Sequence, residues 1–222
     1  MMILRPWLFA AVAVLLVTVA PPGVASAEEA GTFDVVVYGA TPAGVCAAVG
    51  AAREGASVAL VEPLQLIGGM MSSGLGFSDS NQCVRSTLGG LFEEFYLRVE
   101  AEYRRRGIKL LYEVAVKDHR PWTCEPHVAE GVFLALLKEA GVKNFTGQTL
   151  VKVEKDGPRI RSLTTDKSTF RARSWVDASY EGDLMAAAGV AFTVGRESKE
   201  EYGESLAGHQ FPLVYYSRCT AG

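Results

Sequence analysis

The pattern of apolar and polar residues predicts a strand, a helix and a second strand near the start of the chain. Thr32–Tyr38 is a short β-branched run bounded by glycine, which indicates a buried parallel strand. An alanine-rich helix follows and stops at Gly55, and Ser57–Val61 is a second buried strand. Together they form a β-α-β unit of about 30 residues, the length of a nucleotide-binding half-fold.

The pattern beyond this unit predicts further helices and a small antiparallel sheet. Gly68–Ser80 is rich in glycine and serine and indicates a loop. Helices are expected over residues 91–106, where aromatic residues recur on one face, and from Pro126 to Gly141. The three short strands of a meander follow, at Thr149–Glu154, Arg159–Thr164 and Thr169–Asp177. The last strand is apolar enough to return to the main sheet, and an alanine-rich helix then runs to Gly189.

These elements predict an α/β fold with a Rossmann-like domain over residues 28–190 and the meander inserted in it. Residues 191–222 have no terminal-element pattern, so we expect them to be the start of an incomplete second domain, a truncated substrate domain. Phe211–Tyr216 is too apolar for a free tail, and it is expected to expose apolar surface.

Residues 1–27 have the three parts of a secretory signal peptide. Arg5 supplies the positive charge, Trp7–Ala20 is an uninterrupted apolar run, and Ala25–Ala27 is an A-x-A cleavage pattern. We expect cleavage after Ala27, a mature protein that begins at Glu28, and a secreted or periplasmic location. No stable membrane span is expected after cleavage; a retained N-terminal anchor is the alternative.

Composition and charge exclude a nucleic-acid surface. The chain carries a formal net charge of −3 and 21% charged residues, with acids and bases interspersed. Phosphate backbones require a concentrated basic face, and the compact basic run at Arg104–Arg106 lies at a helix end, where cations suit the dipole. No nucleic-acid partner is therefore expected.

The cysteines and histidines show no metal-binding spacing. Cys46 lies on the first helix and is expected to act as a small apolar side chain. One disulfide among Cys83, Cys124 and Cys219 is compatible with export.

The glycine-rich turn between the first strand and helix carries the strongest chemical signal. Gly39 permits a tight turn, Gly44 permits close helix–strand packing, and the helix start presents N–H groups to a pyrophosphate. Thr41 caps the helix, and its hydroxyl is a candidate donor to phosphate. Glu62 directly follows the second strand. A carboxylate at this position accepts hydrogen bonds from the ribose hydroxyls of an adenosine and repels a 2′-phosphate. An ordinary βα turn is the alternative.

Several motifs together resemble the FAD-dependent oxidoreductase family. They are VVVYGATPAG with VEP, then GGMMSSGLG, EPHVAE and DASYEGDLMAAAGV, spread from Asp34 to Gly208. The resemblance implies the N-terminal portion of such a protein, a glutathione-reductase-type FAD fold, and FAD as the cofactor.

The resemblance also implies where FAD contacts the chain. Gly68, Gly69 and Met70 would run past the flavin side, Val151 would offer backbone bonds to adenine, and Ala178–Ser179 and Asp183 would rejoin the cofactor. The full set of expected cofactor-binding residues is Gly39, Thr41, Pro42, Ala43, Gly44, Glu62, Gly68, Gly69, Met70, Val151, Ala178, Ser179 and Asp183. Simpler alternatives are a flexible glycine loop, plain strand core at Val151 and a helix-start acid at Asp183.

The implied function is oxidation of a small organic substrate by hydride transfer to flavin, in an exported enzyme. No catalytic residue is assigned, because groups facing the flavin usually come from a substrate domain in this architecture. Two alternatives remain open: an NAD-dependent dehydrogenase, and a catalytically inactive dinucleotide-binding fragment. The motifs specify no oligomeric state.

Overall fold

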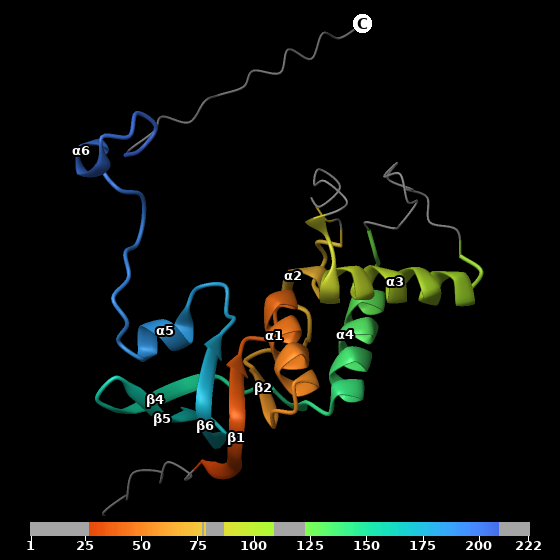
Figure 1. Ribbon diagram of the computed structural model, residues 1–222, viewed down its shortest axis with the longest axis horizontal. Coiled ribbons are helices and arrows are strands. Elements are labelled where there is room, and N and C mark those ends of the chain that lie inside the picture. The colour runs from red at the N-terminus through yellow and green to blue at the C-terminus, as the bar shows by residue number, and fades with distance from the viewer. Residues whose placement is uncertain (1–26, 77, 79–86, 109–122, 209–222) are drawn as a thin grey trace, which may run out of the picture.

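The computed structural model describes residues 27–76, 78, 87–108 and 123–208, and within them a six-stranded sheet (Figure 1). The strand order is β3-β2-β1-β6-β5-β4. The parallel part comprises β1 (Glu28–Tyr38), β2 (Val58–Glu62), β3 (Lys143–Thr146) and β6 (Ser168–Asp177). The antiparallel part comprises β4 (Leu150–Asp156) and β5 (Arg159–Thr165), with β5 also pairing β6. The predicted α/β fold with a three-strand meander is confirmed.

Two strands differ from the sequence prediction. β1 begins at Glu28 rather than Thr32, with a bulge between Glu29 and Gly31. β3 was not expected, because Lys143–Thr146 is short, partly polar and lies at the sheet edge, where it pairs with β2. Its pairing partner, rather than its own pattern, makes it a strand.

Six helices occur in the described residues. They are α1 (Pro42–Arg53), α2 (Gly69–Ser72), α3 (Gly90–Arg105), α4 (Pro126–Ala140), α5 (Asp183–Ala187) and α6 (Lys199–Tyr202). α1, α3 and α4 match the predicted helices, and Gly55 and Gly141 end α1 and α4 in left-handed conformations, with φ of 88° and 75°. α2 lies where a loop was predicted, and α5 ends before the expected Gly189.

Apolar side chains are buried on both faces of the parallel strands. α1 and α4 pack on one face, over side chains such as Val37 and Leu60, and α3 packs against α4 (Figure 1). The meander and α5 cover the other face, where Val61 and Phe170 are buried. Every residue of β2 is buried, as expected for a strand inside a two-sided α/β sheet. Because β1, β2 and β6 are parallel, their carboxyl ends meet at one edge of the sheet.

Beyond α5 the chain leaves the sheet and runs out to α6 (Figure 1). Val190, Phe192 and Leu206 on this stretch are exposed. Residues 1–26, which hold nearly all of the expected signal peptide, and the apolar segment Phe211–Tyr216 lie outside the described residues. The boundary near residue 190 stays a prediction.

The cysteines of the described residues are free thiols. Cys46 is half-buried on α1, and Cys124 is buried, with its N–H donated to the Gly76 carbonyl 3.0 Å away. Burial raises the pKa of the Cys124 thiol to about 11. Cys124 is a free thiol and takes no part in the expected disulfide, whereas Cys83 and Cys219 lie outside the described residues, so a bridge between those two stays a prediction.

Candidate nucleotide-binding cleft

The turn after β1 is fixed by contacts with the end of β6. Gly39 donates its N–H to the Val61 carbonyl at 2.8 Å and has φ of 97°. A Cβ on Gly39 would lie 2.6 Å from the backbone nitrogen of Ser179 and 2.7 Å from the carbonyl carbon of Ala178. Glycine is required here because the chain following β6 passes directly against the turn.

Thr41 caps α1, as predicted, and its hydroxyl also bonds to the end of β6. Its hydroxyl accepts the N–H of Gly44 at 3.1 Å and donates its own proton to the Ala178 carbonyl at 2.8 Å. The one proton of this hydroxyl joins the turn to the end of β6, and its expected bond to a phosphate stays a prediction. No local pattern predicts this bond, because its partners are 137 positions apart in the chain.

The start of α1 nevertheless keeps the features of an anion site. Pro42 occupies the first turn and has no N–H, and the side chain of Ala43 is exposed. Within the described residues, the N–H groups of Thr41 and Ala43 make no hydrogen bond. A Cβ on Gly44 would lie 1.9 Å from the Gly39 carbonyl oxygen, so glycine allows α1 to start directly against β1. Two N–H groups and the positive end of the helix dipole remain available to a phosphate.

Glu62 is held at the end of β2 by two backbone groups. One carboxylate oxygen accepts the N–H of Ala40 at 2.6 Å, and the other accepts the N–H of Leu64 at 2.9 Å. The residue is only 7% exposed, yet it lines the cleft described below. Each carboxylate oxygen can accept more than one hydrogen bond, so Glu62 is oriented by the backbone and still able to accept ribose hydroxyls.

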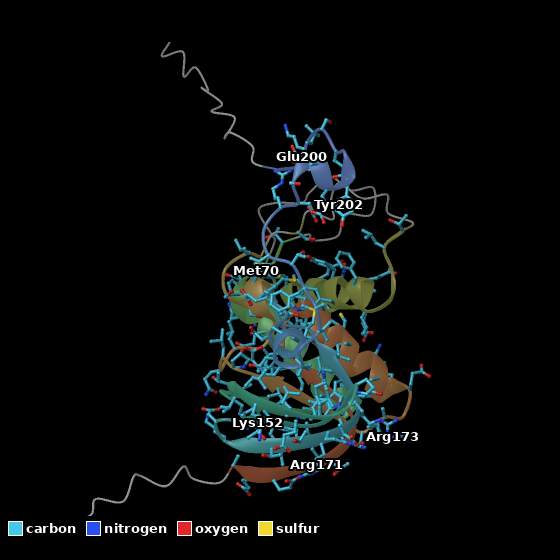
Figure 2. The ribbon with its side chains drawn as sticks, turned by 90° about the vertical axis from the view of Figure 1, so that its left-hand side faces the viewer. Met70, Lys152, Arg171, Arg173, Glu200 and Tyr202 are labelled. Carbon is cyan, nitrogen blue, oxygen red and sulfur yellow. The ribbon has the colours of Figure 1, made fainter. Side chains whose placement is uncertain are left out.

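The Gly68–Gly69 pair is tightly packed rather than a flexible loop. Gly68 donates its N–H to the Ala40 carbonyl at 2.7 Å, and a Cβ on it would lie 2.5 Å from the Phe133 ring. A Cβ on Gly69 would lie 2.3 Å from the Tyr180 hydroxyl. Met70, labelled in Figure 2, lines the cleft next to Gly69, and about half of its surface is exposed.

A carboxylate that sequence analysis missed organises the turn after β6. Asp177 accepts the N–H and the O–H of Ser179, at 3.0 and 2.7 Å, on one oxygen. Its other oxygen accepts the N–H of Met185 at 2.7 Å. Ser179 in turn accepts the N–H of Asp183 at 2.8 Å. The turn that carries the residues from Ser179 to Asp183 is thus fixed by a chain of hydrogen bonds.

These three turns enclose a cleft of about 360 Å³, within the ~300–1,000 Å³ of small-molecule pockets. Seven of the thirteen predicted residues line it: Gly39, Thr41, Glu62, Gly69, Met70, Ser179 and Asp183. Six others were not predicted: Pro63, Leu64, Leu66, Ser73, Tyr180 and Glu181. Each of the six lies within a few positions of a predicted residue, and this closeness in the sequence is the one signal that could have identified them.

The other predicted residues lie around the cleft rather than on its wall. Gly44, Gly68 and Ala178 pack behind it, Pro42 and Ala43 lie at the start of α1, and Val151 lies on β4 with 66% of its surface exposed. Val151 is therefore neither strand core nor part of the cleft wall. The nearest meander group is the N–H of Leu150, which donates to the Tyr38 hydroxyl at 3.1 Å.

The cleft is acidic. Glu62, Glu181 and Asp183 contribute carboxylates, and its described lining includes no lysine or arginine. Attraction for a pyrophosphate must therefore come from N–H groups, hydroxyls and the helix dipole. An acid at the ribose position also disfavours a 2′-phosphate. The glycine-shaped turn, the helix start and Glu62 fit the adenosine and pyrophosphate half of FAD.

The described residues offer neither a metal site nor a membrane-spanning helix. No group of three or more histidine, cysteine or acidic side chains is placed to hold a metal ion. None of the helices is long and apolar enough to cross a bilayer.

Comparisons with known proteins agree with this geometry. A family model described as FAD dependent oxidoreductase matches residues 34–220. Among solved structures, L-proline dehydrogenase from P. horikoshii is 16% identical with a TM-score of 0.52, over 77% of this chain and 59% of that protein. The flavin-dependent brominase Bmp2 is 19% identical with a TM-score of 0.52, over 72% of this chain and 41% of that protein.

At these identities the structural likeness shows the fold alone, and the chain spans 59% or less of the length of either protein. A search of curated proteins gives no match.

Proposed function

This chain belongs to the FAD-dependent oxidoreductase family, and on that premise we propose that its cleft binds the adenosine and pyrophosphate part of FAD. The whole protein is proposed to be an exported enzyme that oxidises a small organic substrate. One observation supports this proposal most strongly. A single cleft at the carboxyl edge of the parallel strands is lined by the phosphate turn, the carboxylate of Glu62 and the Gly69–Met70 segment.

Each part of the cleft has a defined task in this proposal. The N–H groups of Thr41 and Ala43 bind the pyrophosphate, and Glu62 accepts the ribose hydroxyls. Gly69 leaves room beside the backbone for the Tyr180 hydroxyl, and Met70 supplies apolar contact towards the flavin side. Bound flavin supplies the hydride acceptor; the residues described here orient it and exclude water.

The meander and the Gly68–Gly69 turn favour FAD over NAD. A simple NAD-dependent dehydrogenase has no need for either, whereas both are part of the FAD fold implied by the family resemblance. Glu62 alone is compatible with both cofactors.

Export is supported by where the first strand starts. β1 begins at Glu28, immediately after the expected cleavage site, and the Glu28 N–H donates to the Lys167 carbonyl at 2.9 Å. Cleavage after Ala27 would leave every residue of the sheet in place. N-terminal sequencing of exported protein should start at Glu28; an intact Met1 on cytosolic protein would contradict export.

We also propose that residues 191–222 begin a substrate domain, so that residues 28–222 alone are a poor enzyme. Substrate-dependent flavin reduction should be slower for residues 28–222 than for any version extended by downstream sequence. Equal rates would contradict this division.

The binding experiment is an equilibrium titration of the purified full chain with FAD and, separately, with NAD. We expect a flavin absorption spectrum on the protein and an FAD affinity that exceeds the NAD affinity. Tight NAD binding without FAD binding would overturn the proposal. Binding of neither cofactor would favour a fragment without cofactor function.

A further inference from the structure

Tyr180 joins the two walls of the cleft. It extends from the turn between β6 and α5, and its hydroxyl oxygen accepts the N–H of Met70 at 2.8 Å. On the opposite wall, a Cβ on Gly69 would lie 2.3 Å from this oxygen. The absence of a side chain at Gly69 is what makes room for the tyrosine hydroxyl.

The hydroxyl lies beside the turn assigned to the pyrophosphate. The position that a Cβ on Gly69 would occupy is 3.3 Å from the Cα of Thr41 and 2.3 Å from the Tyr180 oxygen. The tyrosine oxygen and the start of α1 are therefore near neighbours across Gly69. Tyr180 and Thr41 line the same cleft.

The proton of this hydroxyl is available to a ligand. In the hydrogen bond with Met70 the tyrosine oxygen is the acceptor, and in the described part of the chain its O–H has no acceptor. The hydroxyl of Thr41 has already donated its proton to Ala178. The cleft's carboxylates cannot donate when ionised, so Tyr180 offers a neutral donor where an anion must bind.

The aromatic side chain is also held in position before any ligand binds. Asp177 fixes the turn on one side of Tyr180 through the N–H and O–H of Ser179. The bond to Met70 fixes the far end of the side chain. A donor held in this way loses little conformational freedom on binding.

We propose that Tyr180 is a cofactor-positioning residue that donates its hydroxyl proton to the pyrophosphate of FAD. In this role it takes the place of a lysine or arginine, which the described lining of the cleft does not include. The inference rests on the proposed function and deepens it, because it assigns a phosphate contact to a residue outside the glycine-rich turn.

The test compares Tyr180→Phe with the wild type in the full chain, and it uses FAD, ADP and adenosine as separate ligands. Tyr202→Phe is the matched control, because Tyr202 lies on α6, exposed and away from Met70 (Figure 2). A hydrogen bond to a charged group predicts that Tyr180→Phe binds FAD and ADP about 10- to 100-fold more weakly. Adenosine affinity should stay unchanged, because it has no phosphate, and Tyr202→Phe should match the wild type.

Three results would overturn the inference. The first is wild-type affinity, or tighter binding, of FAD and ADP by Tyr180→Phe, which would mean that the hydroxyl is neutral or obstructive. The second is an equal loss for adenosine, which would indicate a general distortion of the cleft. The third is a wild type that binds no FAD, and this alone would also overturn the proposed function.

Discussion

Replacing Gly44 by alanine tests the geometry of the phosphate turn with a single methyl group. The added Cβ would lie 1.9 Å from the Gly39 carbonyl oxygen and 3.0 Å from the Ala178 Cβ. Neither neighbour is the end of a flexible side chain. The contact with Gly39 must open by about 1 Å, which moves the start of α1 away from β1.

The size of the effect follows from the cost of such overpacking. Inserting a methyl group into a closed contact costs about 1–3 kcal/mol, and a domain with about 5–15 kcal/mol of stability stays folded. We expect the free energy of unfolding of Gly44→Ala, measured in urea, to fall by about 2 kcal/mol. FAD affinity should fall about tenfold or more as the N–H groups of Thr41 and Ala43 shift. The bulkier Gly44→Val should abolish FAD binding.

Gly50→Ala is the control on the same helix. No atom lies within 4 Å of a Cβ built on Gly50. Alanine should therefore stabilise α1 by about 0.5–1 kcal/mol and leave FAD affinity unchanged. If Gly44→Ala and Gly50→Ala behave alike in both urea unfolding and FAD titration, the close-packed turn is refuted.

Three other predictions address the carboxylates and the buried thiol. Glu62→Gln removes the charged ribose acceptor, so FAD should bind about tenfold more weakly in a fluorescence titration; unchanged affinity would exclude Glu62 from the site. Hydrogen bonds from Arg53 and then Arg98 lower the pKa of Glu94 from 4.5 to about 2, so its stabilisation is present above pH 4.5 and is lost as the pH falls towards 2. Glu94→Gln should remove about 1 kcal/mol of acid-dependent stability, given the pair's partial exposure, and identical pH profiles would contradict this. Cys124 should resist alkylation at pH 8 in the folded protein and react in urea without reductant, as mass spectrometry would show; rapid labelling of the folded protein would show that it is not buried.

The sequence by itself determined the elements whose signals are local. Runs of β-branched residues mark β1 and β2 because a strand buried on both faces must be apolar throughout. Thr41 and Pro42 mark the start of α1, and glycines mark where α1 and α4 end, because each acts on the backbone within a few positions. The glycines of the phosphate turn act in the same local way. The α/β fold was therefore predictable from the pattern, whereas FAD and several of the seven predicted residues of the cleft wall came from the family resemblance.

The tertiary structure alone decided which groups share the cleft and where their protons point. The Thr41 proton goes to Ala178, and Tyr180 reaches Met70, across separations of 137 and 110 positions that no local pattern encodes. Val151 illustrates the converse: its pattern allowed strand core, but β4 leaves the side chain exposed, and the backbone contact with adenine that the family resemblance implies stays a prediction. Hydrogen bonds between segments brought together by the sheet depend on strand order and register. Those are set by burial of the whole core rather than by the residues that form the bonds.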